Sequence, residues 1–391
     1  MNQAIDRFFS TETAFADHSD RELRRIYDLF RLLGNNTLSQ LGAGLTQWAI
    51  RWHLPIKPFV KPLVYDRFCG GETLEKCVPV IARLELQNVM INLNYGVELK
   101  ESDDDFDATL QENLRAIAFA EQYDTVRIIS CKVSGLGPFE LLEKKQNGTL
   151  LSEEDEAAWD RMVHRLDAIC LEAARRGIKI YWDAEETWVQ DAIDDLVDEL
   201  MMRYNRTGVT VYNSFQMYRH DRMAFLMESL DRARTNDYLL GAKLVRGAYM
   251  EKEREHARKQ GLPSPIHETK ALVDRDFDDA VRFCIDHIDH VSVCVASHNE
   301  YSNYLAAQHA DDRSLPRDHP HLWFSQLYGM GEHLTLNLAK KGYNAAEYVP
   351  YGPVREVIPY LIRRAQENSS VDGQMSRELQ VLRSEMERRG M

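Results

Sequence analysis

Short β-rich runs alternate with longer amphipathic runs along most of this chain, and that alternation limits the folds it can adopt. From residue 89 onward, runs rich in β-branched and aromatic residues are each followed by a charged run with helical spacing. The predicted strands are 89–95, 125–133, 178–184, 209–215, 240–245, 291–296, 321–327 and 346–351. The predicted helices are 105–122, 153–176, 188–204, 217–235, 267–288, 299–310, 332–341 and 355–367. This strand–helix repeat predicts an α/β protein with a closed (β/α)8 barrel of the TIM type.

An open, doubly wound parallel sheet is the structural alternative. That fold usually has fewer strands, and no G-x-G-x-x-G follows the first predicted strand. The alternation therefore favours the barrel. Two longer insertions interrupt it, at 135–155 and 250–268, and both follow the carboxyl end of a strand, where barrel enzymes build their sites.

The segment before the barrel reads as helical. Apolar positions recur at helical spacing over 20–50 with an interruption near Gly34, a proline-rich linker follows at 55–62, and a further helix is predicted at 72–86. We expect residues 1–86 to form a helical segment with a linker, 87–375 the barrel, and 376–391 a helical tail.

The charge balance bears on the partners of the chain. It has 48 basic and 62 acidic side chains and a net charge of −14. A nucleic-acid surface would need clustered lysine and arginine, so we expect no nucleic-acid partner. An anionic substrate would need a local patch of positive charge in this acidic protein.

The cysteines and the N-terminus bear on the compartment. Six scattered cysteines form no C-x-x-C pair, which predicts free thiols in a reducing compartment and no metal site. The N-terminus is acidic and lacks the pattern of a signal or transit peptide. No run of about 18 apolar residues exists, and the apolar stretch 54–65 is broken by prolines and lysines. We expect a cytoplasmic protein.

Polar side chains lie at the ends of successive predicted strands. A barrel brings those ends together around one mouth, so the set is a candidate site, although a single charged strand end is usually just solvated. The residues are Lys132, Asp183, Gln216, Lys243, Arg246, Ser297, His298 and Asn299, with Arg363, Arg364 and Glu367 on the last predicted helix.

The arginine pair Arg363 and Arg364 is the strongest candidate for an anion clamp. Guanidinium groups match carboxylates through two parallel hydrogen bonds. Glu367 lies one helical turn from Arg363, where it can pair with an arginine or with a cationic group of a ligand. The alternative is an exposed helix face with one ordinary ion pair, and spacing alone does not decide between the two.

Four motifs together resemble the proline dehydrogenase family. They are YWDAEET at 181–187, KLVRGAYMEKER at 243–254, ASHNE at 296–300 and EYVPYGPVREVIPYLIRRAQENSSV at 347–371. The resemblance runs from about residue 65 to 371, follows the order of the predicted strands, and is closer to the single-function mitochondrial type than to the bifunctional bacterial type. It implies a distorted barrel that holds FAD, with L-proline against the face of the flavin.

The resemblance also implies roles for individual residues. Lys132, Arg363 and Arg364 match positions that bind the proline carboxylate, Tyr348 matches a tyrosine that packs on the pyrrolidine ring, and Glu367 a partner of the arginine pair. Asp183 and Lys243 match catalytic positions: an acid that positions Lys132, and a cation near the reactive flavin nitrogen. The positions that match cofactor contacts are Ala184, Gln216, Lys243, Arg246, Gly247, Ala248, Ser297 and His298.

The sequence departs from many bacterial members, which read RLVKGAY where this chain reads KLVRGAY. The positive charge near the flavin is kept, but the hydrogen-bond geometry at Lys243 changes with the exchange.

The implied reaction is FAD-dependent oxidation of L-proline to 1-pyrroline-5-carboxylate, the first step of proline degradation to glutamate. The family passes its electrons to a membrane quinone, which implies peripheral contact with the inner membrane. Hydroxyproline dehydrogenase is the nearest alternative, but that relative has a small residue at the position of Tyr348. A flavin-free barrel, either a lyase with Lys132 as Schiff base or an inactive binding scaffold, is an alternative of a different class.

Overall fold

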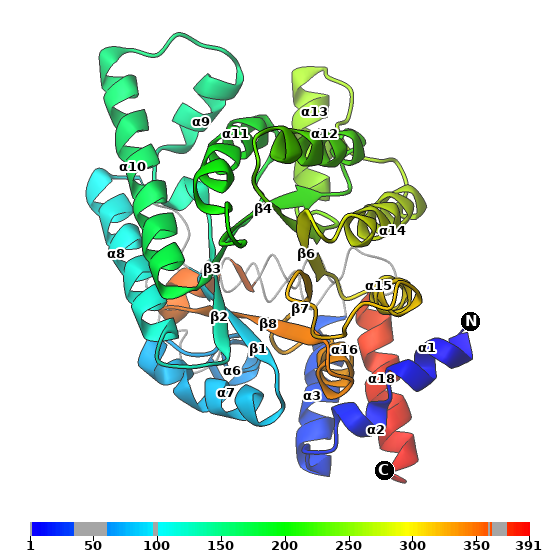
Figure 1. Cartoon of the computed structure of the whole chain (residues 1–391). Helices are drawn as coiled ribbons and strands as arrows, with labels where there is room; N and C mark the ends of the chain where they lie inside the picture. The colour runs from blue at the N-terminus through cyan, green and yellow to red at the C-terminus, as the bar shows by residue number, and fades with distance from the viewer. Residues whose placement is uncertain (1, 35–60, 97–100, 359, 362–373) are drawn as a thin grey trace.

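The structure of this chain is a computed structural model that describes residues 2–34, 61–96, 101–358, 360–361 and 374–391. In these ranges the strands form one closed parallel barrel in chain order, from β1 to β8 (Figure 1). They are β1 (Met90–Tyr95), β2 (Val126–Cys131), β3 (Lys179–Trp182), β4 (Val211–Gln216), β5 (Leu240–Val245), β6 (Val291–Ala296), β7 (Leu322–Leu327) and β8 (Asn344–Tyr351). All eight predicted strands and the barrel fold are confirmed.

The barrel closes where β8 returns to β1. Met90 pairs with Ala346 and Tyr95 pairs with Tyr351, in parallel register. Successive side chains of a strand point alternately into the barrel and out toward the helices. Tyr181 and Tyr212, both fully buried, pack with their ring centroids 4.5 Å apart, so side chains fill the barrel in this layer.

Helices surround the barrel and lie where the sequence predicts them, with ends shifted by a few residues. They are α8 (Asp103–Ala120), α10 (Glu153–Arg176), α11 (Thr187–Tyr204), α12 (Arg222–Thr235), α14 (Lys270–Asp286), α15 (Glu300–Asp312) and α16 (Glu332–Lys340). Local sequence sets their ends. In α10 the Ser152 side chain accepts a hydrogen bond from Asp155 N, and Gly177 ends the helix in a left-handed conformation with φ of 68°.

Both insertions contain helices that the sequence reading missed. The first holds the short turn η2 (Val133–Gly135) and α9 (Phe139–Gln146), and the second holds α13 (Met250–Gln260). The predicted helices at 217–235 and 267–288 begin later than expected, at Arg222 and Lys270. The preceding residues form turns instead, and one of them is tied back to β5, because Met217 N donates to Val245 O over 2.8 Å.

The N-terminal segment wraps the outside of the barrel. Its elements are α1 (Asn2–Phe8), α2 (Thr11–Ala14), α3 (Asp20–Leu33), η1 (Lys61–Tyr65), α6 (Asp66–Phe68) and α7 (Leu74–Leu86). The interruption predicted near Gly34 is confirmed, since α3 ends there. The rest of the predicted helix 20–50 and most of the linker lie outside the described residues. Residues 61 and 62 of that linker belong to the π-helical turn η1 rather than to an extended connection.

The two ends of the chain pack together. Helix α18 (Gln374–Arg388) runs beside α3 in Figure 1. Leu23 and Phe30 of α3 share an apolar cluster with Val381 and Leu382 of α18. The domain boundaries at 87 and 375 stay predictions.

The structure describes all six cysteines and the helices named above. All six cysteines are buried and free. Among the residues that the structure describes, no helix combines the length and apolar character needed to cross a bilayer.

Candidate active site

One carboxylate joins three strands across the mouth of the barrel. Asp183, directly after β3, accepts a hydrogen bond from Lys243 Nζ of β5 on Oδ1 at 2.5 Å and from the Tyr348 hydroxyl of β8 on Oδ2 at 2.8 Å. The side chains of Lys243 and Asp183 are only 8% and 14% exposed. A buried charge needs such partners, because an unpaired one carries a large desolvation penalty. The sequence placed these residues in one site but did not predict this bridge.

Aromatic rings hold the Lys243 ammonium from two sides. Its Nζ lies 5.8 Å from the ring centroid of Tyr181 and 5.3 Å from that of Tyr348. Both distances fall within the range of cation–π attraction. The positive charge of Lys243 is therefore fixed at the mouth by one carboxylate and two ring faces.

Lys132 lies on the neighbouring side of the mouth, after β2. Its Nζ donates to the Tyr249 hydroxyl at 3.4 Å. Burial raises the pKa of Glu185, and the charge of Lys132 opposes that rise. The backbone N–H and the hydroxyl of Ser134 both donate to the Glu185 carboxyl. Lys132 thus faces Tyr249 and the buried acid Glu185.

Sequence reasoning gave no role to Tyr249 or Glu185. Both stand inside the motifs that carry the resemblance, Glu185 two residues after Asp183 and Tyr249 directly after Ala248. Their position inside these motifs was the sequence feature that could have indicated that they belong to the site.

Gln216 leaves a polar atom that no described group satisfies. Its Nε2 donates to Glu185 O at 3.0 Å, while its buried Oε1 has no hydrogen-bond partner among the described residues. Buried polar atoms are nearly always hydrogen-bonded, so an unpaired acceptor beside the mouth marks a place where a ligand can donate.

Arg246 organises the strand ends on the opposite side. Its guanidinium donates to Asp274 Oδ1 at 2.7 Å, Ser297 Oγ at 2.6 Å and Ser302 Oγ at 2.8 Å. His298 Nε2 accepts the backbone N–H of Leu327 at 3.0 Å, which ties the loop after β6 to the end of β7.

The arginine pair cannot be placed in this geometry. Arg363, Arg364 and Glu367 lie outside the described residues. The described start of the segment that leads to them, at 354–358, is helical. Val354, Val357 and Ile358 belong to one apolar cluster with Tyr348. The assignment of Arg363, Arg364 and Glu367 to the substrate stays a prediction.

A sequence model of the family described as proline dehydrogenase matches residues 77–377 of this chain. The chain belongs to the proline dehydrogenase family.

Curated relatives agree with this membership. The carbapenem antibiotics biosynthesis protein CarD of Pectobacterium carotovorum subsp. carotovorum is 32% identical over 327 residues, which cover 84% of this chain and 85% of CarD. Mitochondrial proline dehydrogenase 1 is 37% identical over 248 residues in Drosophila melanogaster and 36% over 242 residues in Homo sapiens. Those matches cover 61% of this chain but only 36% and 40% of the two mitochondrial proteins.

A solved structure supports the fold. Proline utilization A (PutA) from Bdellovibrio bacteriovorus, inactivated by N-propargylglycine, superposes with a TM-score of 0.72 at 18% identity. The match covers 93% of this chain and 38% of that protein. This proline dehydrogenase family member therefore has the same barrel fold as one part of that longer protein.

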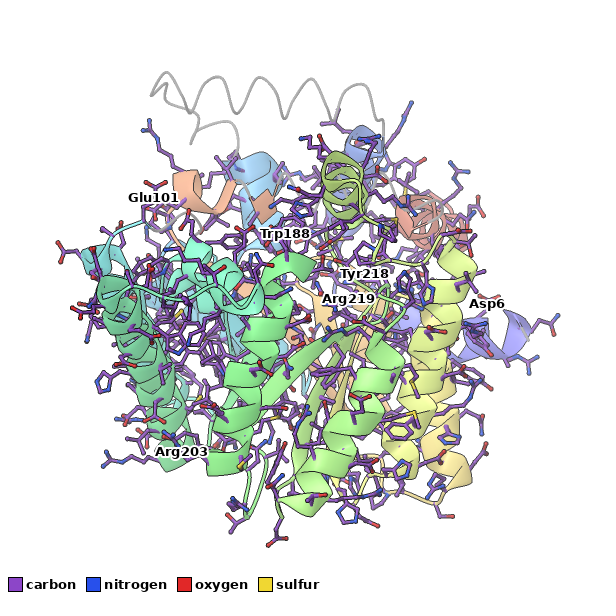
Figure 2. All side chains as sticks on the ribbon, turned by 90° about the horizontal axis from the view of Figure 1, so that it is seen from above. Asp6, Glu101, Trp188, Arg203, Tyr218 and Arg219 are labelled. Carbon is purple, nitrogen blue, oxygen red and sulfur yellow. The ribbon has the colours of Figure 1, made fainter. Side chains whose placement is uncertain are left out.

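Helix α13 covers one side of the mouth in this family member. Figure 2 shows Trp188 near the start of α11, at the end opposite Arg203. The Trp188 ring stacks on His256 of α13 with centroids 3.9 Å apart. Glu253 of α13, 1% exposed, accepts from Thr187 N at 2.9 Å and from the Tyr218 hydroxyl at 3.3 Å. The insertion after β5 is thereby fastened to the loop after β3.

Gly247 tolerates no side chain, and we predict that Gly247→Ala destabilises the protein. Its φ is +122°, and an added Cβ would lie 2.5 Å from ring carbons of the buried Tyr218. Strained backbone and overpacking each cost about 1–3 kcal/mol. We expect the free energy of unfolding in urea to fall by about 2 kcal/mol or more. Gly208→Ala is the control, because nothing lies within 4 Å of a Cβ at that position. Equal stability of the two variants would contradict the prediction.

Proposed function

We propose that this chain oxidises L-proline to 1-pyrroline-5-carboxylate with FAD as cofactor and a membrane quinone as electron acceptor. The reaction is the first step of proline degradation to glutamate. Within the proline dehydrogenase family, the observation that carries the proposal is the bridge from Asp183 to Lys243 and Tyr348 at the mouth of the barrel.

The residues around the mouth fit a flavin. Gln216 Oε1 is a buried acceptor without a described partner, as a ring N–H requires, and the Lys243 cation lies on the next strand. Gly247 lets the backbone pass close to Tyr218, where a side chain would collide. We propose that the cofactor is held by Ala184, Gln216, Lys243, Arg246, Gly247, Ala248, Ser297 and His298.

The chemistry divides between the cofactor and the chain. A bound flavin supplies an acceptor for the hydride that leaves the proline carbon next to nitrogen. Lys243 contributes a fixed positive charge where negative charge develops, and this preorganised charge needs no rearrangement during the reaction. Asp183 keeps that ammonium and the Tyr348 hydroxyl in place. The ring amine of proline must be neutral at this step, because its lone pair drives loss of the hydride.

Substrate binding falls to the carboxylate clamp. We propose that Lys132, Arg363 and Arg364 hold the proline carboxylate, that Glu367 pairs with the arginines, and that the Tyr348 ring packs on the pyrrolidine. Fixing the ring at reacting distance removes much of the entropic part of the barrier. Because a quinone acceptor resides in the membrane, the proposal includes peripheral membrane contact. The stretch at 54–65 is the candidate for it, and its part up to residue 60 lies outside the described residues.

Flavin content tests the oxidoreductase proposal against the flavin-free lyase. The purified protein should show a flavin absorption band, or gain one on reconstitution with FAD. A colourless protein that cannot be reconstituted, and that borohydride traps on Lys132 as a substrate adduct, would overturn the proposal in favour of the lyase.

Tyr348 should select proline over hydroxyproline. Its side chain is buried and its hydroxyl is bonded to Asp183, so moving the ring to admit a substrate hydroxyl breaks that hydrogen bond. We predict at least about tenfold higher kcat/KM for proline, the size that one misfitting group typically causes. Tyr348→Ser should reduce the ratio of kcat/KM for proline to kcat/KM for hydroxyproline. Comparable values for the two substrates in the unmodified protein would favour the hydroxyproline alternative.

A further inference from the structure

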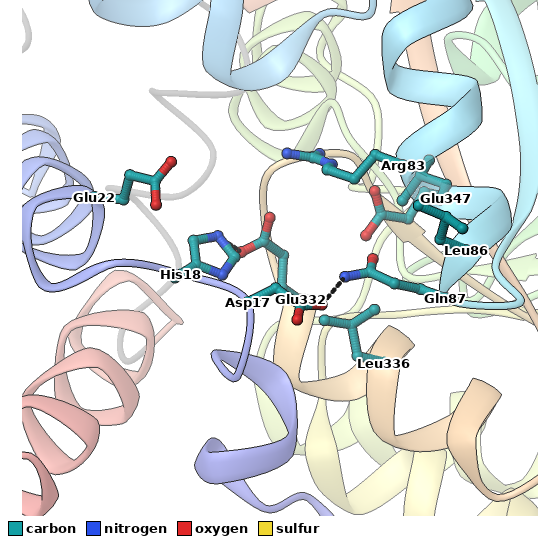
Figure 3. Close-up of a pocket in the computed structure, with 10 residues that line it drawn as sticks. Asp17, His18, Glu22, Arg83, Leu86, Gln87, Glu332, Leu336 and Glu347 are labelled. Carbon is teal, nitrogen blue, oxygen red and sulfur yellow. Dashed lines mark hydrogen bonds and ion pairs between the residues drawn. The ribbon is translucent and has the colours of Figure 1, made fainter.

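A cavity of about 480 Å³ lies outside the barrel, between the outer face of β8 and the helices that cover it. Figure 3 shows it between the connection from α2 to α3, helix α7, helix α16 and strand β8. His18, Arg83, Glu332 and Glu347 face this space, and Leu84 and Leu336 form apolar parts of its wall. None of these residues belongs to the proposed proline site.

Glu347 is the unusual member of this cavity. It precedes Tyr348 on β8, and neighbouring residues of a strand face opposite sides, so Glu347 points outward while Tyr348 points into the barrel. Its side chain reaches into the cavity (Figure 3), is 1% exposed, and its Oε2 has no hydrogen-bond partner among the described residues. Burial, reinforced by the charge of Glu332, raises the pKa of Glu347 to about 8.

The other acids of the cavity already have partners. Glu332 forms an ion pair with Arg67 at 3.1 Å and lies 3.6 Å from His18 Nε2. Although burial opposes it, Arg67 lowers the pKa of Glu332 to about 2. Asp17 accepts from Gln87 Nε2 at 3.1 Å. Glu332 Oε2 makes no hydrogen bond to a described group, but Arg67 and His18 lie within ion-pair distance of it. Glu347 is thus the acid of this cavity with neither an ion pair nor a hydrogen bond to a described group.

The basic groups near the cavity do not neutralise the charge of Glu347. Arg67 Nη1 donates a hydrogen bond to Glu332 Oε1 at 3.1 Å, and Arg67 Nη2 lies 3.1 Å from Glu332 Oε2 as an ion pair. Arg83 donates to the Tyr328 hydroxyl at 2.9 Å, and its charge only partly offsets the burial of Glu347. Leu84, Leu86 and Leu336 form the apolar part of the wall, and Leu86 at its edge is 87% exposed.

We propose that this cavity binds a small organic cation, a primary ammonium on a short apolar chain, with its head group on Glu347. The apolar chain lies along Leu84, Leu86 and Leu336. A cation favours the ionised carboxylate, so binding near neutral pH removes the proton from Glu347 and releases it to solvent. The titratable and charged groups around Glu347 come from every element packed against it. They are Glu332 from α16, Arg67 from α6, Arg83 from α7, Tyr328 after β7, and Asp17, His18 and Glu22 from the connection between α2 and α3 and the start of α3.

Calorimetry with butylammonium chloride on the full chain tests the proposal. We expect saturable binding. Below pH 8 the affinity should increase about tenfold for each unit by which the pH is raised, because one proton leaves for each cation bound. Titrations in two buffers of different ionisation enthalpy should show release of about one proton near pH 7. Butan-1-ol and butyrate, matched in chain length, should bind at least about tenfold more weakly because they lack the cation.

Matched variants assign the binding to Glu347. Glu347→Gln removes the carboxylate and should lower butylammonium affinity at least about tenfold. Glu85→Gln makes the same change on α7 outside the cavity lining and should leave the affinity unchanged. If Glu347→Gln fails to fold, proton release by the unmodified protein still tests the site. Absence of butylammonium binding, tighter binding of butyrate, or binding without proton release would overturn the proposal.

A zwitterionic amino acid presents the same ammonium and a carboxylate besides. Norvaline distinguishes this source from a simple amine. If norvaline binds more tightly than butylammonium, and Arg83→Leu removes this difference in affinity, the ligand is an amino acid. Weaker binding of norvaline identifies an amine. In both cases the ligand must bind more weakly to Glu347→Gln. Because Glu347 lies outside the proposed proline site, this loss assigns the binding to the cavity.

Discussion

Replacing Asp183 with asparagine should lower kcat/KM for proline about 100-fold. Asp183 is the shared acceptor of the Lys243 ammonium and the Tyr348 hydroxyl. An asparagine can still accept one hydrogen bond, but it leaves the buried ammonium without a counter-charge. Removing one partner of a buried charge pair costs about 3 kcal/mol, which corresponds to roughly 100-fold in rate. Steady-state kinetics at equal flavin content measures the effect.

Two control variants separate the effect of losing the Asp183 charge from a general effect of substitution on the protein. Tyr348→Phe removes one hydrogen bond and keeps the ring, so it should cost only about 1 kcal/mol, or about fivefold. Asp124→Asn makes the same change on a side chain that is 97% exposed and should have no effect. An Asp183→Asn protein within about threefold of the unmodified enzyme would show that the bridge does not support catalysis.

The second large effect is expected for Arg364→Met, chiefly as a higher KM for proline. We assign Arg364 to the substrate carboxylate from the resemblance of its motif, since it lies outside the described residues. A charge-assisted hydrogen bond contributes about 1.5–3 kcal/mol, so loss of a two-point contact should raise KM about 100-fold. The measurement is the dependence of the rate on proline concentration.

Pyrrolidine, which lacks the carboxylate, is the matched control substrate. Its turnover should be the same in the unmodified protein and in Arg364→Met. Arg234→Met, an exposed position on α12, controls for loss of one positive charge. An unchanged KM for proline in Arg364→Met would remove Arg364 from the carboxylate clamp.

The barrel could be predicted from the sequence because each strand is a local pattern. Period-two and helical spacing are visible within a dozen residues, and their eightfold repetition leaves few topologies. Helices α9 and α13 were missed because their local patterns are weak. Helix α9 has only 8 residues, and α13 buries only Glu253 and Ala257, so neither helix shows a strong apolar period.

The site could be predicted as a set of residues but not as a geometry. Strand ends and motifs indicated Asp183, Lys243 and Tyr348, yet their bridge joins positions 60 and 165 residues apart. Which pairs meet depends on side-chain reach across the barrel, and no spacing along the chain encodes that distance. Glu347 had no sequence signal either, because its burial depends on how α7 and α16 pack over β8.

The most direct test of the proposed function is an anaerobic titration of the purified, flavin-loaded protein with L-proline. We predict that proline bleaches the flavin absorption band, that 1-pyrroline-5-carboxylate appears in equal amount, and that a soluble quinone restores the colour. A flavin that stays oxidised in excess proline, in a protein shown to be folded, would contradict the assignment of proline oxidation to this chain.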